Sequence, residues 1–302
     1  MKVFPAIMST PSKPAPRRSR RPGGKPARPA AAPAAVNDPA EGERIAKRLA
    51  RAGLCSRREA ERWIEEGRVE VNGQVLRSPA VNVKPGDAII VNGQPLKAAE
   101  PTRMWRYHKP AGLLTTNRDP EGRPTIFEKL PAELGRVISV GRLDFNSEGL
   151  LLLTNDGGLA RHLEMPSTGW GRRYRVRVHG AVDERALARL GEGSTVDGVR
   201  YGPVEAALER VQGSNAWLTM SLREGKNREI RKLCAHLGLE VTRLIRIGYG
   251  AFRLDDLKRG EVATVPDRQL RAQLGKAAAQ FQILDAKQAE SHHAHRRRPP
   301  SR

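Results

Sequence analysis

The stretch VISVGRLDFNSEGLLLLTNDGGLA, residues 137–160, decides how the centre of this chain folds. The apolar runs at 137–140 and 150–153 predict two buried strands, and a turn is predicted at 155–158. Asp144 lies in the connection between the two strands. Polar loops on a rigid scaffold often carry reactive groups. An aspartate in a loop also commonly forms a turn or caps a helix, so position alone leaves Asp144 with both interpretations.

The segments around this stretch, from 101 to 275, mix strands and helices without a regular βαβ order. Residues 172–180 alternate between basic side chains and apolar or aromatic ones, which predicts a strand, and 215–222 and 242–252 predict two more. Residues 227–238 predict an amphipathic helix, with Arg228, Arg231 and Lys232 on its polar stripe. The glycine-containing segment 191–202 predicts a loop between elements. Interspersed elements of this kind indicate an α+β domain with a mixed or largely antiparallel sheet.

A smaller block, residues 43–100, precedes this domain. Ser56 and Glu59 form a capping box, which predicts that a second short helix follows the first. Asn-Gly pairs at 72–73 and 92–93 predict tight hairpins. Cations at i, i+3, i+4 and i+7 share one face of the first helix, and no acid lies among them; they are Arg44, Lys47, Arg48 and Arg51. Such a stripe is often merely solvated, but repulsion among four cations favours a surface that binds an anion.

Charge identifies the class of partner. The chain has 302 residues, enough for about two domains, and a formal net charge of +21. Residues 1–42 contribute +6 and residues 291–302 contribute +4, which leaves +11 on the rest. Because the body itself is basic, we expect a polyanionic partner: nucleic acid first, and an anionic membrane surface second.

The ends of the chain are low in complexity. Residues 1–42 are rich in Pro, Ala and Arg, and we expect a disordered tail there and a second basic tail at 276–302. The N-terminal composition is partly that of an organelle transit peptide, but its prolines would interrupt the amphipathic helix that such peptides form. The longest aliphatic run, 150–153, is far too short to span a bilayer. Cys55 and Cys234 are isolated, which argues against a disulfide framework or a cysteine-based zinc site and is typical of cytoplasmic proteins.

Several motifs together resemble one family. The pattern GRLDxxSxGLLLLTxDG is similar to the catalytic motif of the RsuA/RluB-type pseudouridine synthases, which include the RluE and RluF types. The segments that also match, in the family's order, are YHKPAGLLTT (107–116), DPEGRPTIFEKLP (119–131), RRYRVRV (172–178) and LREGKNREIRKL (222–233). Two segments of the 43–100 block, RLARAGLCSRREAERWIEEGRVEVNG and VKPGDAIIV, resemble the S4 RNA-binding domain. The DPEGRPT segment and the basic extensions look most like the branch that modifies large-subunit ribosomal RNA.

The resemblance implies a function and a set of residues. It implies conversion of uridine to pseudouridine in ribosomal RNA, in the cytoplasm during ribosome biogenesis, with no cofactor, no metal and no obligate protein partner. Asp144 matches the essential aspartate, Tyr174 the tyrosine that packs on the target base, and Arg231 the basic residue that pairs with the aspartate. Arg142 is implied to bind phosphate or order the loop. The residues that we expect to bind RNA are Arg44, Lys47, Arg48, Arg51, Arg57, Arg58, Arg228 and Lys232.

The chemistry explains why a carboxylate would need a cation beside it. The reaction breaks the C1′–N1 bond, rotates the uracil and joins C1′ to C5, and an ionised carboxylate can attack C6 or C1′ or support a glycal route. A base closing over Asp144 removes water and disfavours the ionised form, whereas a nearby guanidinium favours it.

Two other functions stay open on the sequence. One is a non-catalytic S4-domain RNA-binding or ribosome-assembly factor, which the basic stripe and tails fit equally well. The other is a glycoside hydrolase that uses Asp144 and Glu148 as paired carboxylates, although such enzymes usually have aromatic-rich clefts and this chain is only 4% aromatic.

Overall fold

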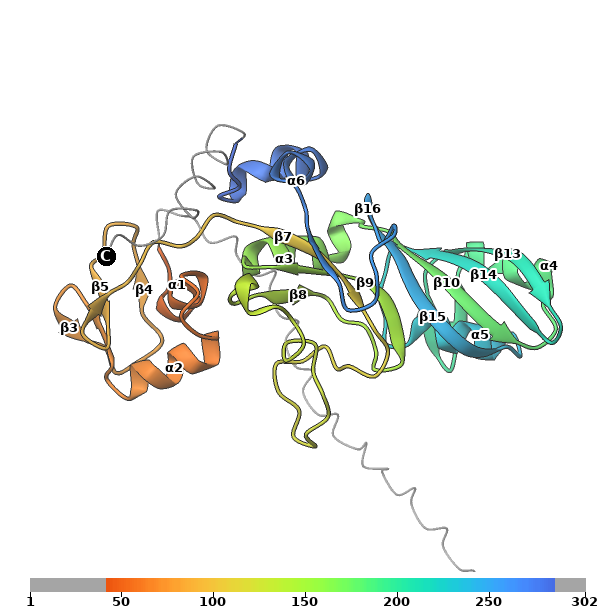
Figure 1. The fold of residues 1–302 in the computed structure, drawn as a ribbon, viewed down its shortest axis with the longest axis horizontal. Coiled ribbons are helices and arrows are strands. Elements are labelled where there is room, and N and C mark those ends of the chain that lie inside the picture. The colour runs from red at the N-terminus through yellow and green to blue at the C-terminus, as the bar shows by residue number, and fades with distance from the viewer. Residues whose placement is uncertain (1–41, 286–302) are drawn as a thin grey trace, which may run out of the picture. The chain divides into compact units, whose positions relative to one another are not determined.

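The computed structural model describes residues 42–285 (Figure 1). The predictions of disorder for 1–41 and of a basic tail for 286–302 therefore lie outside the described residues. Within the described range, an N-terminal part up to about residue 95 and a larger part from about residue 104 each have hydrophobic clusters of their own.

The N-terminal part contains two short helices and small antiparallel sheets (Figure 1, red to orange). The strand order in its larger sheet is β3-β2-β5-β6, and β1 pairs with β4. The Ser56 hydroxyl accepts a hydrogen bond from the backbone N–H of Glu59 at 3.1 Å, which confirms the predicted cap. Asn72 and Asn92 have φ of 51° and 53°, as tight Asn-Gly hairpins require. The elements are β1 (Glu43–Arg44), α1 (Ile45–Arg51), α2 (Arg57–Glu65), β2 (Val69–Val71), β3 (Gln74–Val75), β4 (Asn82–Val83), β5 (Ile89–Val91) and β6 (Gln94–Pro95).

The larger part is built on one nine-stranded sheet (Figure 1). Its main path runs β13-β14-β10-β15-β9-β7-β17, while β16 pairs with β15 and β8 with β9. The strands are β7 (Met104–Lys109), β8 (Ile138–Val140), β9 (Ser147–Thr154), β10 (Arg172–His179), β13 (Val204–Gln212), β14 (Asn215–Leu222), β15 (Glu240–Tyr249), β16 (Phe252–Arg253) and β17 (Val262–Thr264).

Short helices and one further hairpin complete this part. They are η2 (Ala132–Leu134), α3 (Gly157–Glu164), η3 (Pro166–Thr168), α4 (Glu184–Arg189), η4 (Leu190–Glu192), β11 (Ser194–Val196), β12 (Val199–Tyr201), α5 (Glu229–His236), α6 (Asp267–Leu274) and η5 (Gly275–Gln280). Among the described residues, no helix combines the length and the apolar character needed to cross a bilayer.

The junction between β9 and β15 makes the sheet mixed, because these two strands run parallel whereas the other pairs of the sheet are antiparallel. This confirms the predicted α+β class with a mixed sheet. Gly149 permits the close approach of the two strands: its φ is 105°, and a Cβ there would lie 2.3 Å from the Arg246 carbonyl oxygen. Every residue of β9 is buried, so the connection that begins it is held by a rigid strand.

Three details of the larger part differ from the sequence prediction. The predicted turn at 155–158 is instead the start of α3, because the Asp156 carboxylate accepts hydrogen bonds from the first backbone N–H groups of that helix. Residues 191–202, expected to form a loop, contain the β11–β12 hairpin. Residues after 275 were expected to form a tail, but Ile283 is 4% exposed in the apolar cluster that includes the buried residues of α3.

Candidate active site

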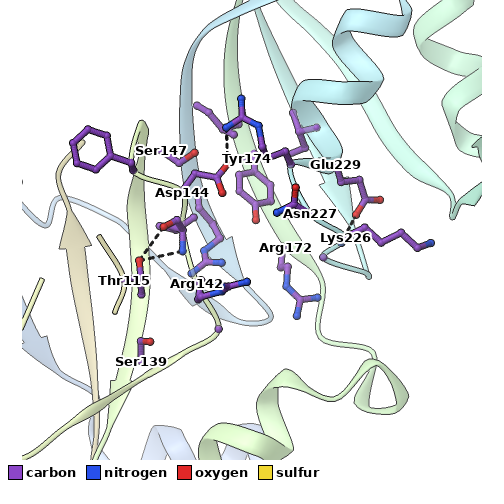
Figure 2. A pocket seen from close by; sticks show the side chains of 18 of the residues that line it. Thr115, Ser139, Arg142, Asp144, Ser147, Arg172, Tyr174, Lys226, Asn227 and Glu229 are labelled. Atoms are coloured by element: carbon purple, nitrogen blue, oxygen red, sulfur yellow. Dashed lines mark hydrogen bonds and ion pairs between the residues drawn. The ribbon is translucent and has the colours of Figure 1, made fainter. Parts of the chain in front are cut away.

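A cavity of about 910 Å³ opens where β8, β9, β10 and β15 meet the loop before α5 (Figure 2). Its size is within the roughly 300–1,000 Å³ typical of ligand pockets. Three of the four residues that we expected in the active site, Arg142, Asp144 and Tyr174, line it, whereas Arg231 does not. The sequence thus brings together residues from the connection after β8, from β10 and from the α5 region at one cavity.

Hydrogen bonds hold the backbone of the Asp144 connection in place. The Lys109 ammonium, fully buried, donates to the carbonyl oxygens of Asp144 at 3.2 Å and Ser147 at 2.8 Å. The Thr115 hydroxyl donates to the Leu143 carbonyl at 2.9 Å (Figure 2). Burial lowers the pKa of Lys109 to about 8, although the nearby Asp144 and Glu148 carboxylates act in the opposite direction. These bonds hold the backbone at Asp144 in one position, and they do not involve its carboxylate, which faces the cavity.

The carboxylate of Asp144 pairs with Arg228, at 3.6 Å between Oδ2 and Nη1. The structure therefore does not contain the direct ion pair between Asp144 and Arg231 that we expected. Arg231 instead donates to the carbonyl oxygens of Val241 at 3.0 Å and Asn146 at 3.3 Å. Burial first, and then the neighbouring Arg228, lower the pKa of Arg231, while Asp144 raises it. Arg231 thus contributes charge near Asp144 but makes its hydrogen bonds to backbone.

Tyr174 stands across the cavity from Asp144 (Figure 2). It lies on β10 opposite Met220 of β14 and Arg246 of β15, and its half-buried ring packs against two hydrophobic clusters. Tyr174 is therefore both a core residue and a wall of the cavity. Arg142 is exposed at the cavity edge.

Arg246 is a cavity residue that the sequence interpretation missed. It is 2% exposed, and its Nε donates to the Leu150 carbonyl at 2.7 Å, while its Nη2 is buried with no protein partner. A buried donor without a partner is costly, which favours an acceptor on a ligand. The sequence feature that could have identified Arg246 is a single arginine on the inward face of an otherwise apolar strand segment, LIRIG.

The loop before α5 has an unusual acid. Glu229 is 3% exposed, and its Oε2 accepts from the Lys226 backbone N–H at 2.9 Å. Burial, and also the charge of Glu224, raise the pKa of Glu229 to about 7, although the Lys226 N–H acts against this. Glu224 in turn accepts from the Gly202 N–H and the Lys226 ammonium, both at 2.6 Å. These contacts close the turn that carries Arg228 to Asp144.

Glu148 is part of a structural ion pair. Its carboxylate binds Arg243 at 2.6 Å and Arg259 at 3.1 Å, and it does not line the cavity. Burial acts to raise the pKa of Glu148, but the two guanidinium groups lower it overall. A general acid would need the opposite shift, so the paired-carboxylate glycosidase interpretation has no support at this position.

The expected RNA-binding cations have different surroundings. Lys47 and Arg48 both pair with Glu43, at 3.3 and 3.6 Å, so the α1 stripe is partly neutralised, which the sequence interpretation did not foresee. Arg44, just before α1, donates to the Ala80 carbonyl. Arg51 pairs with Asp156 at 3.3 Å. Of the remaining four, Arg228 pairs with Asp144, whereas Arg57, Arg58 and Lys232 have no ion pair among the described residues. Arg57 and Arg58 are exposed, and Lys232 is half-buried.

Within residues 42–285, no group of three or more His, Cys, Asp or Glu side chains is arranged to hold a metal ion. The two cysteines are free and buried, and burial raises their pKa values, to about 11 for Cys55 and about 12 for Cys234. They are packing residues in the structure.

Comparison with known proteins agrees with this arrangement. The S4 domain family model matches residues 43–89, and the RNA pseudouridylate synthase model matches residues 103–236. An uncharacterised RNA pseudouridine synthase of Rickettsia bellii is 48% identical over 74% of this chain and 96% of that protein. The ribosomal large subunit pseudouridine synthase B of Haemophilus influenzae is 42% identical over 88% of this chain and 76% of that protein.

A solved structure is also similar. A crystal structure of a pseudouridylate synthase aligns with 76% of this chain and 99% of its own, with a TM-score of 0.54 and 28% identity. The chain belongs to the RNA pseudouridine synthase family, in the group that joins an S4 domain to the catalytic domain. It is an enzyme of that class and of the RluB type.

Proposed function

We propose that this enzyme converts a uridine of large-subunit ribosomal RNA to pseudouridine, with Asp144 as the catalytic carboxylate. The observation that carries the proposal is the Asp144 carboxylate, which faces a 910 Å³ cavity beside Arg228 and across from Tyr174. The relatives named as large-subunit enzymes support the choice of RNA. Such a substrate places the enzyme in the cytoplasm, where ribosomes assemble.

The cavity can hold a flipped uridine. Extruding a base costs a few kcal/mol, which stacking on an aromatic ring and contacts to phosphate offset. Tyr174 supplies the ring, and the open Nη2 of Arg246 supplies a donor to the base or ribose. Attack at C6, attack at C1′ and the glycal route all begin with the ionised Asp144 carboxylate against the target nucleoside. The Arg228 guanidinium lies beside that carboxylate and offsets its negative charge when the base excludes water.

The reaction is balanced without a cofactor. The C1′–N1 bond breaks, the C1′–C5 bond forms, the C5 hydrogen leaves as a proton, and N1 gains one. The protein therefore needs to bind, orient and deprotonate, which the residues of the cavity can do.

The test is pseudouridine mapping of ribosomal RNA by carbodiimide-dependent reverse-transcription stops. Cells that lack the protein should lose one or a few stops in large-subunit RNA, and the wild-type protein should restore them. The Asp256→Asn variant, which removes an exposed carboxylate outside the cavity, should restore them too. Unchanged large-subunit stops in the deleted cells would overturn the choice of RNA and favour the assembly-factor alternative.

A further inference from the structure

A second cavity, of about 700 Å³, lies on the opposite face of the β10–β14–β15 sheet from the Asp144 cavity. The two cavities share Arg172 and Leu222, so they meet at the end of the sheet where β10 begins. The proposed function uses the first cavity and gives no role to the second.

A β-bulge in β15 determines which side chains of β10 and β15 line each of the two cavities. Tyr174 is opposite Arg246, but its neighbour Arg173 is opposite Gly248, so Ile247 is the extra residue. Bulges re-aim side chains and are frequent beside active sites. This one directs Tyr174 and Arg246 into the Asp144 cavity, and it sets Arg173 and Gly248 side by side at the second.

Gly248 leaves the floor of the second cavity open. Its backbone is not in the left-handed region, and a Cβ there would meet the Arg173 Cβ at 3.5 Å and the Phe252 carbonyl at 3.7 Å, which are ordinary contacts. The fold therefore does not require glycine at this strand position. A glycine inside a strand weakens it and often marks a place where another backbone approaches closely.

The walls of the second cavity are cationic. Arg173, Arg223 and Arg253 line it together with the shared Arg172. Other arginines near this sheet are neutralised: Arg175 pairs with Glu209 at 2.7 Å. By contrast, Arg173 and Arg253 have no ion pair among the described residues.

Two acids also line the second cavity, but the arginines outnumber them. Glu224 is occupied by the Gly202 N–H and the Lys226 ammonium. Glu205 lies on β13 opposite Ser221, with β14 between it and Arg173. No ion pair joins Glu205 to an arginine in the described part of the chain.

We propose that this second cavity binds the sugar-phosphate backbone of a nucleotide that flanks the target uridine. Arginine forks suit phosphate oxygens, and most contacts of proteins to nucleic acid go to phosphate and sugar. Arg172 stands between the two cavities, held by the Trp170 and Arg223 carbonyls and the Tyr249 hydroxyl, so a strand can pass over it from one cavity to the other. The inference rests on the proposed function, since it takes the same RNA.

The experiment compares single-turnover pseudouridine formation by variants on two RNAs. One RNA is a large-subunit fragment that contains the target, and the other is shortened to remove the nucleotides that flank it. On the long RNA, the Arg173→Gln/Arg253→Gln double variant should raise the half-saturating enzyme concentration about tenfold with the maximal rate within about twofold. It should also reduce the slope of the logarithm of the binding constant against the logarithm of the salt concentration by about one to two, because one or two phosphate contacts are lost.

The matched control is Arg177→Gln, on the same strand and face as Arg173 but outside the cavity; it should bind normally. Gly248→Leu should reproduce the double variant by filling the floor without removing charge, with folding checked by its melting temperature. On the short RNA, the variants and the wild type should bind equally.

Some outcomes would overturn the proposal. An equal loss in Arg177→Gln would mean diffuse attraction, and a loss that persists on the short RNA, or no loss at all, would mean that the cavity holds no flanking nucleotide. An inactive wild-type enzyme on the long RNA would instead overturn the proposed function.

Discussion

The ion pair between Arg228 and Asp144 depends on one backbone conformation. Arg228 has φ of 53°, in the left-handed region that few residues other than glycine and asparagine adopt easily. It stands just before α5, and this conformation directs its guanidinium toward the carboxylate. Strained backbone is frequent at functional sites, where the surrounding structure holds it. Glu229 and the Lys226 N–H hold it here.

Arg228→Gln should lower kcat about tenfold, because the closed site loses the cation that pairs with the Asp144 carboxylate. The free energy of unfolding should change little, because both partners are partly exposed and such pairs contribute about 0–1 kcal/mol. Single-turnover kinetics and urea unfolding measure both effects. Arg185→Gln, which removes an exposed charge from α4, is the control. A normal kcat in Arg228→Gln would show that Arg231 alone supplies the charge.

Lys109→Met should destabilise the protein by about 2–4 kcal/mol and lower kcat by more than tenfold. The variant leaves the carbonyl oxygens of Asp144 and Ser147 buried without their donor, and an unsatisfied buried acceptor costs about 1–3 kcal/mol. Urea unfolding and kcat at a temperature well below the melting point separate the two effects. Lys129→Met, at an exposed lysine, should change neither. Full activity in Lys109→Met would show that the connection holds its shape without the ammonium.

At the scale of elements, the sequence predicts some features better than others. Strand β14 matches its prediction, Asn215–Leu222, because strict alternation leaves one arrangement that buries the apolar face. The Ser56 cap at the start of α2 is local and was also predicted correctly. The position of Asp144 between two buried strands was predicted for the same reason.

Other features depend on contacts that a pattern does not contain. Helical spacing placed Arg228 and Arg231 on one stripe, but Arg228 precedes the helix in a left-handed turn, so it and not Arg231 pairs with Asp144. The low complexity after residue 275 suggested a tail, yet Ile283 returns to the core. Arg246 is aimed by the bulge in β15, and a bulge has no signature in this sequence.

The turn that precedes α5 should make stability depend on pH. Because the pKa of Glu229 is raised from 4.5 to about 7, the folded protein holds this proton more tightly than the unfolded chain does. The stability from this group is therefore complete below about pH 4.5 and is lost as pH rises through about 7. Glu229→Gln keeps an acceptor and cannot ionise. Between pH 5 and 8, the free energy of unfolding of this variant should therefore decrease by about 1–3 kcal/mol less than that of the wild type.

Urea unfolding at several pH values measures this difference. The control is Glu192→Gln, an exposed glutamate whose variant should follow the wild-type curve. Parallel curves for wild type and Glu229→Gln would contradict the raised pKa.

At the scale of the whole molecule, the S4 part should supply affinity and the larger part chemistry. Arg57 and Arg58 are exposed at the start of α2, whereas Lys47 and Arg48 share Glu43. The Arg57→Gln/Arg58→Gln variant should therefore raise KM several-fold, leave kcat unchanged and reduce the salt slope of binding by about one to two. A change in kcat with an unchanged KM would show that the S4 cations act on the reaction instead.

The most direct test of the central claim is the release of tritium from uridine labelled at C5 in large-subunit ribosomal RNA, since joining C1′ to C5 expels that hydrogen. Asp144→Asn removes the charge and keeps the size of the side chain. The variant should release no tritium above background while it binds the RNA within about twofold of the wild type, and Asp256→Asn should release it at the wild-type rate. Tritium release by Asp144→Asn at a rate near that of the wild type would contradict the account.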